Sequence, residues 1–233
     1  MIRWIAFDAD DTLWENEKYY HTGQVKLAEL LSDYLTYDEV QAELLKTETD
    51  NMPWYGYGIK AFGLSMIETA IRVSKGAVGS KEVAVILDHL RNMLEQQTQV
   101  LPGVLETLEM LKHDYHLLVI TKGDILDQER KLSLSGLQDY FMAYDVVSDK
   151  KDDTYKQILS RYSIEPSQFV MVGNSLRSDI LPVVKLGGHG VYIPHHFTWE
   201  HEVINDVTPH QDGFIQIEKM QELPEVIQQI NNR

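Results

Sequence analysis

Apolar residues along the chain gather in short, unbroken runs that end abruptly at polar clusters. The clearest runs are residues 4–7, 117–120, 143–147 and 169–172. A short apolar run bounded by polar residues predicts a buried β-strand. Weaker runs at 191–193 and 214–217 predict a fifth strand and a sixth.

Between these runs the apolar residues change to helical spacing. Tyr155, Ile158, Leu159 and Tyr162 follow the i, i+3, i+4, i+7 pattern of one helix face. A comparable pattern follows residue 103, between the first two predicted strands. Strands that alternate with helices predict an α/β fold with a doubly wound parallel sheet.

Residues 15–97 have no strand pattern. Amphipathic spacing over this stretch predicts helices through about 27–34, 37–47, 66–73 and 83–93, with an aromatic and Gly-rich turn at 52–58. The chain is therefore predicted to hold two domains: an α/β core domain of residues 1–15 and 98–233, and an all-helical domain inserted at 16–97.

Polar clusters follow four of the predicted strands at the point where each strand ends. The clusters are Asp8 with Asp10, Thr121, Lys150 with Lys151, and Asn174 with Asp179. In a doubly wound sheet, ligands bind outside the carboxyl ends of the strands. An isolated Asp-x-Asp is more often a solvated acidic turn, but four clusters at one edge favour a functional site.

The residue types at this edge favour phosphoryl chemistry. Oxygen ligands without any cysteine favour Mg²⁺ over zinc. One carboxylate can attack phosphorus, and a second can act as general acid and base. The Thr121 hydroxyl and the backbone N–H groups that follow it can hold phosphoryl oxygens, while a lysine neutralises developing charge.

Composition and net charge limit the classes of molecule that this protein is expected to bind. A hydrophobic fraction of 43% and a charged fraction of 24% are ordinary for a globular protein. The formal net charge of -15 argues against nucleic acid and anionic membranes as partners, although one small anion remains compatible. The chain shows no secretory signal pattern and no apolar run of the ~20 residues that a membrane span needs, so a cytoplasmic location is expected.

These residues resemble the haloacid dehalogenase superfamily of phosphohydrolases. The segment from Asp8 to Thr12 matches the Asp-x-Asp-x-Thr motif of that family. The resemblance implies that Asp8 is the nucleophile and a Mg²⁺ ligand. It implies that Asp10 is the general acid and base and binds the metal through its backbone carbonyl. Thr121 would bind the phosphoryl group, with Lys122 and Gly123 in the positions that follow.

The rest of the resemblance implies further roles. The inserted helices are similar to the family's helical cap, which covers the site and selects the substrate. Lys150 has the better spacing to an aromatic residue, but its neighbour Lys151 stays open as the active-site lysine. Asn174 stands where the family more often has Asp; it would bind the metal through its carbonyl oxygen, together with Asp179.

The second aspartate of the motif also favours one reaction type. Dehalogenase members of the superfamily lack the residue equivalent to Asp10, so phosphate-ester hydrolysis is favoured over dehalogenation. Residues 198–202 and 173–179 also resemble an uncharacterised phosphatase-like branch of the superfamily. The sequence therefore predicts a Mg²⁺-dependent phosphomonoesterase that hydrolyses a small phosphorylated metabolite through an aspartyl-phosphate.

Several alternatives remain at this point. A phospho-ligand-binding or regulatory protein on the same fold is the first, and a phosphonate hydrolase is a less favoured one. His195, His196 and His201 are more typical of a surface loop than of a zinc site. Trp54, Tyr55, Tyr57 and Lys60 suit core packing or solvent as well as a substrate pocket. Neither the substrate nor the oligomeric state can be inferred from the sequence.

Overall fold

The computed structural model describes residues 1–196 and 213–232. Residues 198–202, including His201, lie outside this range. The chain divides into two compact units, each described separately below. The α/β unit comprises Met1–Glu17, Thr98–Lys122 and Lys131–Arg233, and the helical unit comprises Lys18–Gln97 and Gly123–Arg130.

The described part of the α/β unit contains a six-stranded sheet in the order β3-β2-β1-β4-β5-β6. Every pair of neighbouring strands is parallel, which confirms the predicted doubly wound fold. The strands are β1 (Trp4–Phe7), β2 (His116–Lys122), β3 (Ala143–Val147), β4 (Phe169–Gly173), β5 (His189–Tyr192) and β6 (Phe214–Gln216). Since the strands are parallel, their carboxyl ends lie at one edge of the sheet.

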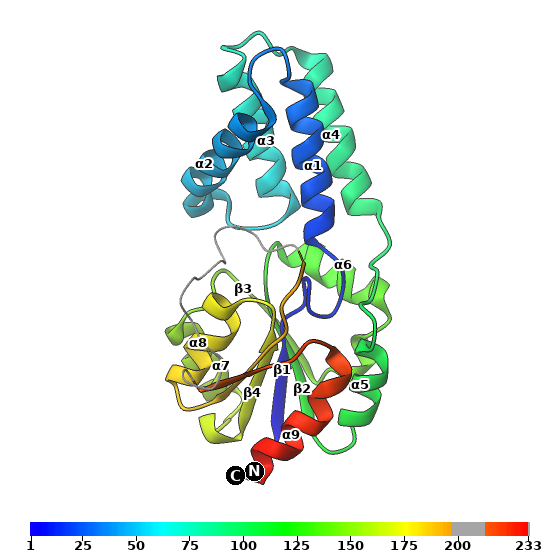
Figure 1. Ribbon diagram of the computed structural model, residues 1–233, viewed down its shortest axis with the longest axis vertical. Coiled ribbons are helices and arrows are strands. Elements are labelled where there is room, and N and C mark those ends of the chain that lie inside the picture. The colour runs from blue at the N-terminus through cyan, green and yellow to red at the C-terminus, as the bar shows by residue number, and fades with distance from the viewer. Residues whose placement is uncertain (197–212, 233) are drawn as a thin grey trace. The chain divides into compact units, whose positions relative to one another are not determined.

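Helices cover both faces of this sheet (Figure 1). They are α5 (Val104–Leu111), α6 (Ile125–Ser135), α7 (Asp152–Arg161), α8 (Leu181–Lys185) and α9 (Leu223–Asn231). A π-helix, Leu176–Ile180, connects β4 to α8. The first six residues of α6 belong to the helical unit, and its remainder belongs to the α/β unit.

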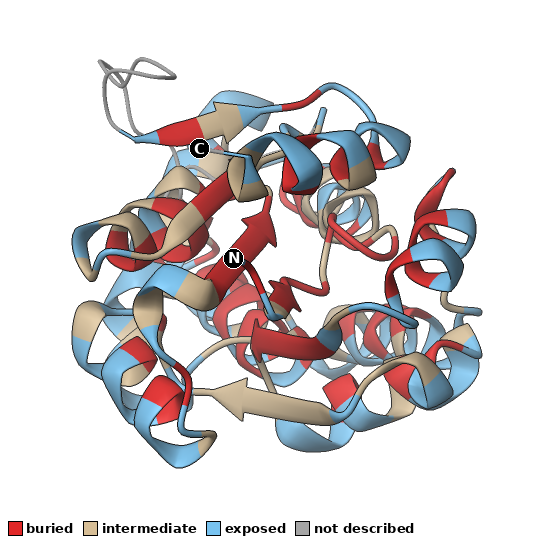
Figure 2. Cartoon of the chain, turned by 90° about the horizontal axis from the view of Figure 1, so that it is seen from below, coloured by how far each residue is buried: buried red, intermediate tan, exposed pale blue. Residues whose placement is uncertain are grey.

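Alternating side chains of β1 separate the two layers of the α/β core. Ile5 and Phe7 pack in the cluster that contains residues of α5 and α9, whereas Ala6 packs in the cluster with residues of α7. This period of two is what a strand buried on both faces requires. Strand β4 is buried along its whole length, whereas the edge strand β3 is only half-buried (Figure 2).

The helical unit is built on four helices and has a core of its own. They are α1 (Glu17–Leu30), α2 (Tyr37–Tyr55), α3 (Ile59–Val73) and α4 (Ser80–Glu95). Buried residues of all four helices, such as Leu27, Leu44, Met66 and Ile86, form one apolar cluster. Among the described residues, every helix is too short or too polar to span a lipid bilayer.

Helix α2 is longer than the hydrophobic pattern predicts. The pattern predicts a helix to about residue 47 and a turn at 52–58, but the helix continues to Tyr55 and includes Pro53 in its last turn. The helix ends at Gly56, which has a φ of 68°. A glycine adopts this left-handed conformation without the steric cost of a Cβ atom, so it terminates the helix.

The observed boundaries of the helical unit differ from the predicted ones at residues 123–130. This segment packs with the helical unit, and Lys60 forms an ion pair with Asp124, Nζ to Oδ2, at 2.9 Å. Two aromatic residues at the end of α2 are exposed: Trp54 is 82% exposed and Tyr55 50%. These two side chains therefore do not belong to the core of the helical unit.

The half-buried carboxyl group of Glu48 on α2 makes the stability of the protein depend on pH. Burial raises the pKa of Glu48 to about 7. Between its unfolded and folded pKa values the folded chain binds more protons, so this contribution to stability falls as the pH rises from about 4.5 to about 7. In urea unfolding at pH 8, we expect Glu48→Gln to be more stable than the wild type by about 1–2 kcal/mol.

At pH 4 the same variant and the wild type are expected to have equal free energies of unfolding. Glu29→Gln, at an exposed position of α1, is the matched control and leaves stability unchanged at both pH values. An equal effect of Glu48→Gln at pH 4 and pH 8 would contradict the prediction.

Candidate active site

The ends of β1, β2 and β4 bring the predicted polar residues to one edge of the sheet. Phe7 is in register with Val119 of β2 and with Val172 of β4. Asp8 follows directly, and its backbone N–H donates to the carbonyl oxygen of Val172 at 2.8 Å. The sheet register therefore fixes the position of Asp8 beside the end of β4.

Lys150 lies between two carboxylates of this edge. Its Nζ donates to Asp8 Oδ1 and, at 2.7 Å, to Asp179 Oδ1. The side chains of Lys150 and Asp179 are each 1% exposed. The neighbouring Lys151 is different, because its side chain is 77% exposed and pairs with Asp149. Of the two lysines that the sequence leaves open, the structure brings Lys150 to the acidic residues.

Asp8, Lys150 and Asp179 form a triad in which burial and the neighbouring charges shift pKa values in opposite directions. Burial raises the pKa of Asp8 to about 7, and the nearby Asp179 carboxylate acts in the same direction, whereas Lys150 opposes it. For Lys150, burial disfavours the charged form, but Asp179 and Asp8 together raise the pKa of its ammonium group above the usual value. The triad therefore holds a protonated lysine beside a carboxyl group that burial makes costly to ionise.

The loop after β4 holds Asp179 in place. Asp179 Oδ2 accepts a hydrogen bond from the Ser175 backbone N–H at 3.0 Å. A Cβ atom on residue 173 would lie 2.3 Å from the same oxygen, so the close approach of Asp179 requires Gly173. Asn174 lies in the same loop, and its Oδ1 accepts a hydrogen bond from the Thr12 hydroxyl at 3.4 Å.

Asp10 lies at the start of the loop that follows Asp8. Its Oδ1 accepts hydrogen bonds from Trp14 Nε1 at 2.8 Å and from Lys131 Nζ at 3.0 Å. The side chain of Asp10 is 22% exposed, compared with 11% for Asp8. The two aspartates of the motif thus have different partners and different exposure, which suits different roles.

The predicted phosphoryl-binding residues lie at the end of β2. Thr121 is buried, and its hydroxyl donates to the carbonyl oxygen of Lys122 at 3.2 Å. The ammonium group of Lys122 donates to Ser178 Oγ at 2.9 Å, in the loop that also holds Asp179. Gly123 follows with a φ of 145°, and it belongs to the helical unit.

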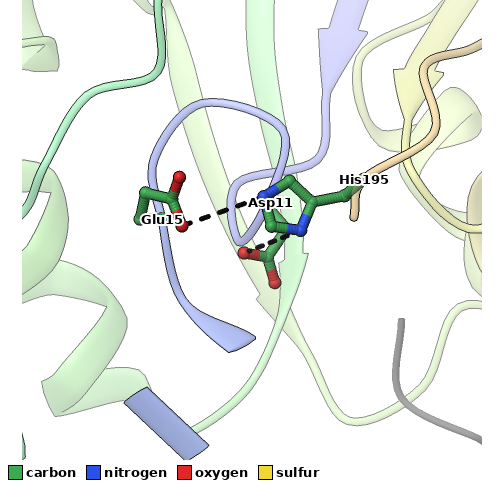
Figure 3. A group of neighbouring side chains, drawn as sticks. All are labelled: Asp11, Glu15 and His195. Atoms are coloured by element: carbon green, nitrogen blue, oxygen red, sulfur yellow. Dashed lines mark ion pairs between the residues drawn. The ribbon is translucent and has the colours of Figure 1, made fainter. Parts of the chain in front are cut away.

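A second cluster joins Asp11, Glu15 and His195 and was not identified from the sequence (Figure 3). The His195 ring lies between the two carboxylates: Nδ1 is 3.6 Å from Asp11 Oδ1, and Nε2 is 3.8 Å from Glu15 Oε2. The side chain of His195 is only 9% exposed. The interpretation of 195–196 as surface residues is therefore wrong for His195, although His196 is exposed.

The imidazole ring of His195 connects the two carboxylates of this cluster. Each ring nitrogen faces a different carboxylate, so the imidazole itself fills the space between them (Figure 3). Asp11 Oδ1 also accepts the backbone N–H groups of Asn16 and Glu17 at the start of α1. Burial, with Asp10 nearby, raises the pKa of Asp11 to about 6. Histidine residues after a strand give no sequence signal for such a long-range contact.

Comparison with known proteins identifies the family of this chain. The model of haloacid dehalogenase-like hydrolases matches residues 2–187. The chain belongs to this family. A crystal structure of a haloacid dehalogenase-like family hydrolase from Xanthomonas campestris is similar, with 35% identity and a TM-score of 0.88. The similarity covers 99% of this chain and 92% of the other.

Two curated relatives of this haloacid dehalogenase-like hydrolase are phosphatases. N-acylneuraminate-9-phosphatase of Mus musculus is 26% identical over 191 residues, which are 77% of each chain. Glyceraldehyde 3-phosphate phosphatase of Pyrococcus furiosus is 26% identical over 199 residues, which are 80% of this chain and 78% of the relative. The relatives thus support a phosphatase-type hydrolase.

Members of the family generally use a divalent metal. Asp8, Asp179 and Asn174 offer oxygen donors, which hard divalent cations prefer. Because burial raises the pKa of Asp8 even with Lys150 beside it, an added cation would favour the ionised carboxylate.

Lys150 and Lys151 provide a matched pair for testing the buried triad. Lys150→Met leaves Asp8 and Asp179 facing each other without a counter-charge, so we expect a loss of about 3 kcal/mol in the free energy of unfolding at pH 8. Lys151→Met removes an exposed charge and should change it by less than about 0.5 kcal/mol. Urea unfolding monitored by circular dichroism measures both, and equal losses for the two variants would contradict the assignment.

Proposed function

We propose that this haloacid dehalogenase-like hydrolase is a Mg²⁺-dependent phosphomonoesterase that acts on a small phosphorylated metabolite. The observation that carries the proposal is the buried Lys150 ammonium group between Asp8 and Asp179. Asp10 and Thr121 lie at the same edge of the sheet, at the carboxyl ends of β1 and β2. A nucleophilic carboxylate needs a nearby cation that neutralises the phosphoryl charge in the transition state.

In the proposed reaction, Asp8 attacks phosphorus and forms an aspartyl-phosphate. Asp10 donates a proton to the departing alkoxide and then accepts a proton from the water that hydrolyses the intermediate. Thr121 binds the phosphoryl oxygens through its hydroxyl, with Lys122 and the Gly123 backbone beside it. Lys150 neutralises charge while the phosphoryl group is transferred.

A bound Mg²⁺ would neutralise phosphoryl charge alongside Lys150. Its proposed ligands are the Asp8 carboxylate, the Asp10 backbone carbonyl, Asn174 and Asp179. Asn174 supplies a carbonyl oxygen but no negative charge, so the site carries one charge less than it would with aspartate. The two carboxylates of the set still suit a metal that needs few protein ligands and keeps several waters.

We also propose that the helical unit is the cap that selects the substrate, corresponding to the predicted domain 16–97. The mouse relative is named for a phosphorylated sugar acid and the Pyrococcus furiosus relative for a triose phosphate. These names differ, but both describe small phosphorylated molecules, which supports that class of substrate here. A small phosphate ester also suits an enzyme whose net charge of -15 disfavours nucleic acid.

A phosphatase assay with metal control tests the proposal. We expect the purified protein to hydrolyse p-nitrophenyl phosphate and members of a phosphate-ester panel with Mg²⁺ and to lose this activity in EDTA. Asp8→Asn should lower kcat by at least about 1,000-fold, because the amide is a poor nucleophile. Asp153→Asn, an 84% exposed control, should keep wild-type activity.

Absence of turnover across the panel, or retained activity in Asp8→Asn, would contradict the proposal. The amide at Asn174 gives one reason to consider a phospho-ligand-binding protein on the same fold. That alternative predicts a higher melting temperature with ligand and no phosphate release. Phosphate release that is lost in Asp10→Asn would rule it out.

A further inference from the structure

Two donors from different elements bind the same oxygen of the Asp10 carboxylate. Trp14 Nε1 and Lys131 Nζ lie 2.8 Å and 3.0 Å from Asp10 Oδ1. Trp14 is a local partner, because the Asp11 backbone N–H also donates to its carbonyl oxygen at 2.7 Å and closes the loop. Lys131 is a distant partner that comes from α6. Two donors on one oxygen restrict the rotation of the carboxyl group, which carries Oδ2 with it.

Lys131 connects Asp10 to the chain segment that begins α1. Its ammonium group also donates to Asn16 Oδ1 at 2.7 Å. Asn16 is buried, and its backbone N–H donates to Asp11 Oδ1 at 2.8 Å. The lysine therefore joins the Asp10 side chain to a loop that is already fixed by backbone hydrogen bonds.

The ion pair between Lys131 and Asp10 is sheltered from solvent. The Lys131 side chain is 12% exposed and that of Asp10 is 22% exposed. Exposed pairs of the same chain, such as Lys46 with Asp50, have exposed fractions of 60% and 61%. A sheltered pair orders its side chains more strongly than an exposed one, which typically contributes little.

We propose that Lys131 is a positioning residue for Asp10: its ammonium group, together with the Trp14 indole N–H, aims the Asp10 carboxyl group for proton transfer. This proposal rests on the function proposed above, in which Asp10 exchanges protons with the leaving group and with water. Lys131 acts through Asp10 and does not contact the reacting atoms. Misplacement of a catalytic group by about 1 Å can cost about 100-fold in rate, so such a residue affects kcat.

Steady-state kinetics with p-nitrophenyl phosphate and Mg²⁺ test the kinetic part. Lys131→Met should lower kcat by about 10- to 100-fold and change KM by less than about twofold, because the residues proposed to bind phosphate are untouched. Lys131→Arg keeps a cationic donor and should retain at least about a third of the wild-type kcat. Lys112→Met removes a 33% exposed lysine that pairs with Glu109 and is the control with unchanged kcat.

A double-mutant cycle separates positioning from general stabilisation. If Lys131 acts through Asp10, Lys131→Met should cause no further loss of kcat, within about twofold, in an Asp10→Asn background. Losses that multiply in the double variant would overturn the proposal. Lys131→Gln, which removes the charge but keeps a donor for Asn16, replaces Lys131→Met if that variant does not fold.

The indole N–H of Trp14 gives a readout that does not depend on activity. Trp14→Phe identifies its signal among the four tryptophans in a ¹⁵N–¹H NMR spectrum. Lys131→Met should shift this signal and accelerate its hydrogen exchange. Without the lysine, the Asp10 carboxylate that accepts the indole N–H is held less firmly, so this hydrogen bond opens more often. Lys131→Arg and Lys112→Met should leave it unchanged.

An unchanged Trp14 signal in folded Lys131→Met would overturn the positioning proposal. A wild-type protein without any phosphatase activity would instead refute the proposed function. In that case the Trp14 signal still decides whether Lys131 holds the Asp10 carboxylate. The two failures are therefore distinguishable.

Discussion

The buried ammonium group of Lys150 is the interaction on which the charged edge of the sheet depends. Asp8 follows β1 and Asp179 lies in the π-helix after β4, so the pairing of these strands and the hydrogen bonds of the loop after β4 bring two carboxylates together. Carboxylates held this close and out of water repel each other unless a cation compensates them. Lys150, which follows β3, supplies that cation, and the resulting triad joins three chain segments that are distant in the sequence.

The other acidic residues after β1 also have basic partners from distant parts of the chain. Asp10 has Lys131 of α6 as a partner, and Asp11 has His195, which follows β5. The carboxylates of the three aspartates between Asp8 and Asp11 would repel one another in an isolated peptide. The fold brings a basic group from a different part of the chain to each of them. Each carboxylate therefore has its own environment, and separate environments allow neighbouring carboxyl groups to take different chemical roles.

Patterns that repeat over short distances made much of this structure predictable. The abrupt ends of the apolar runs predict the sheet edge with Asp8, Thr121 and Asn174, because strand ends are local features. Partners such as Lys131 and His195 are not predictable, since an isolated lysine or histidine carries no signal for the element it contacts. The end of α2 was also missed, because a proline and two glycines within six residues predict a turn, whereas the helix includes Pro53 and ends only at Gly56.

The stereochemical course at phosphorus tests the central claim most directly, that Asp8 forms a covalent intermediate at this edge. The substrate is a phosphomonoester made chiral with ¹⁶O, ¹⁷O and ¹⁸O, and transfer to an added alcohol acceptor gives a product whose configuration can be measured. Attack by Asp8 followed by attack of the acceptor inverts phosphorus twice, so the account predicts net retention. Net inversion would show a single direct displacement and would contradict it.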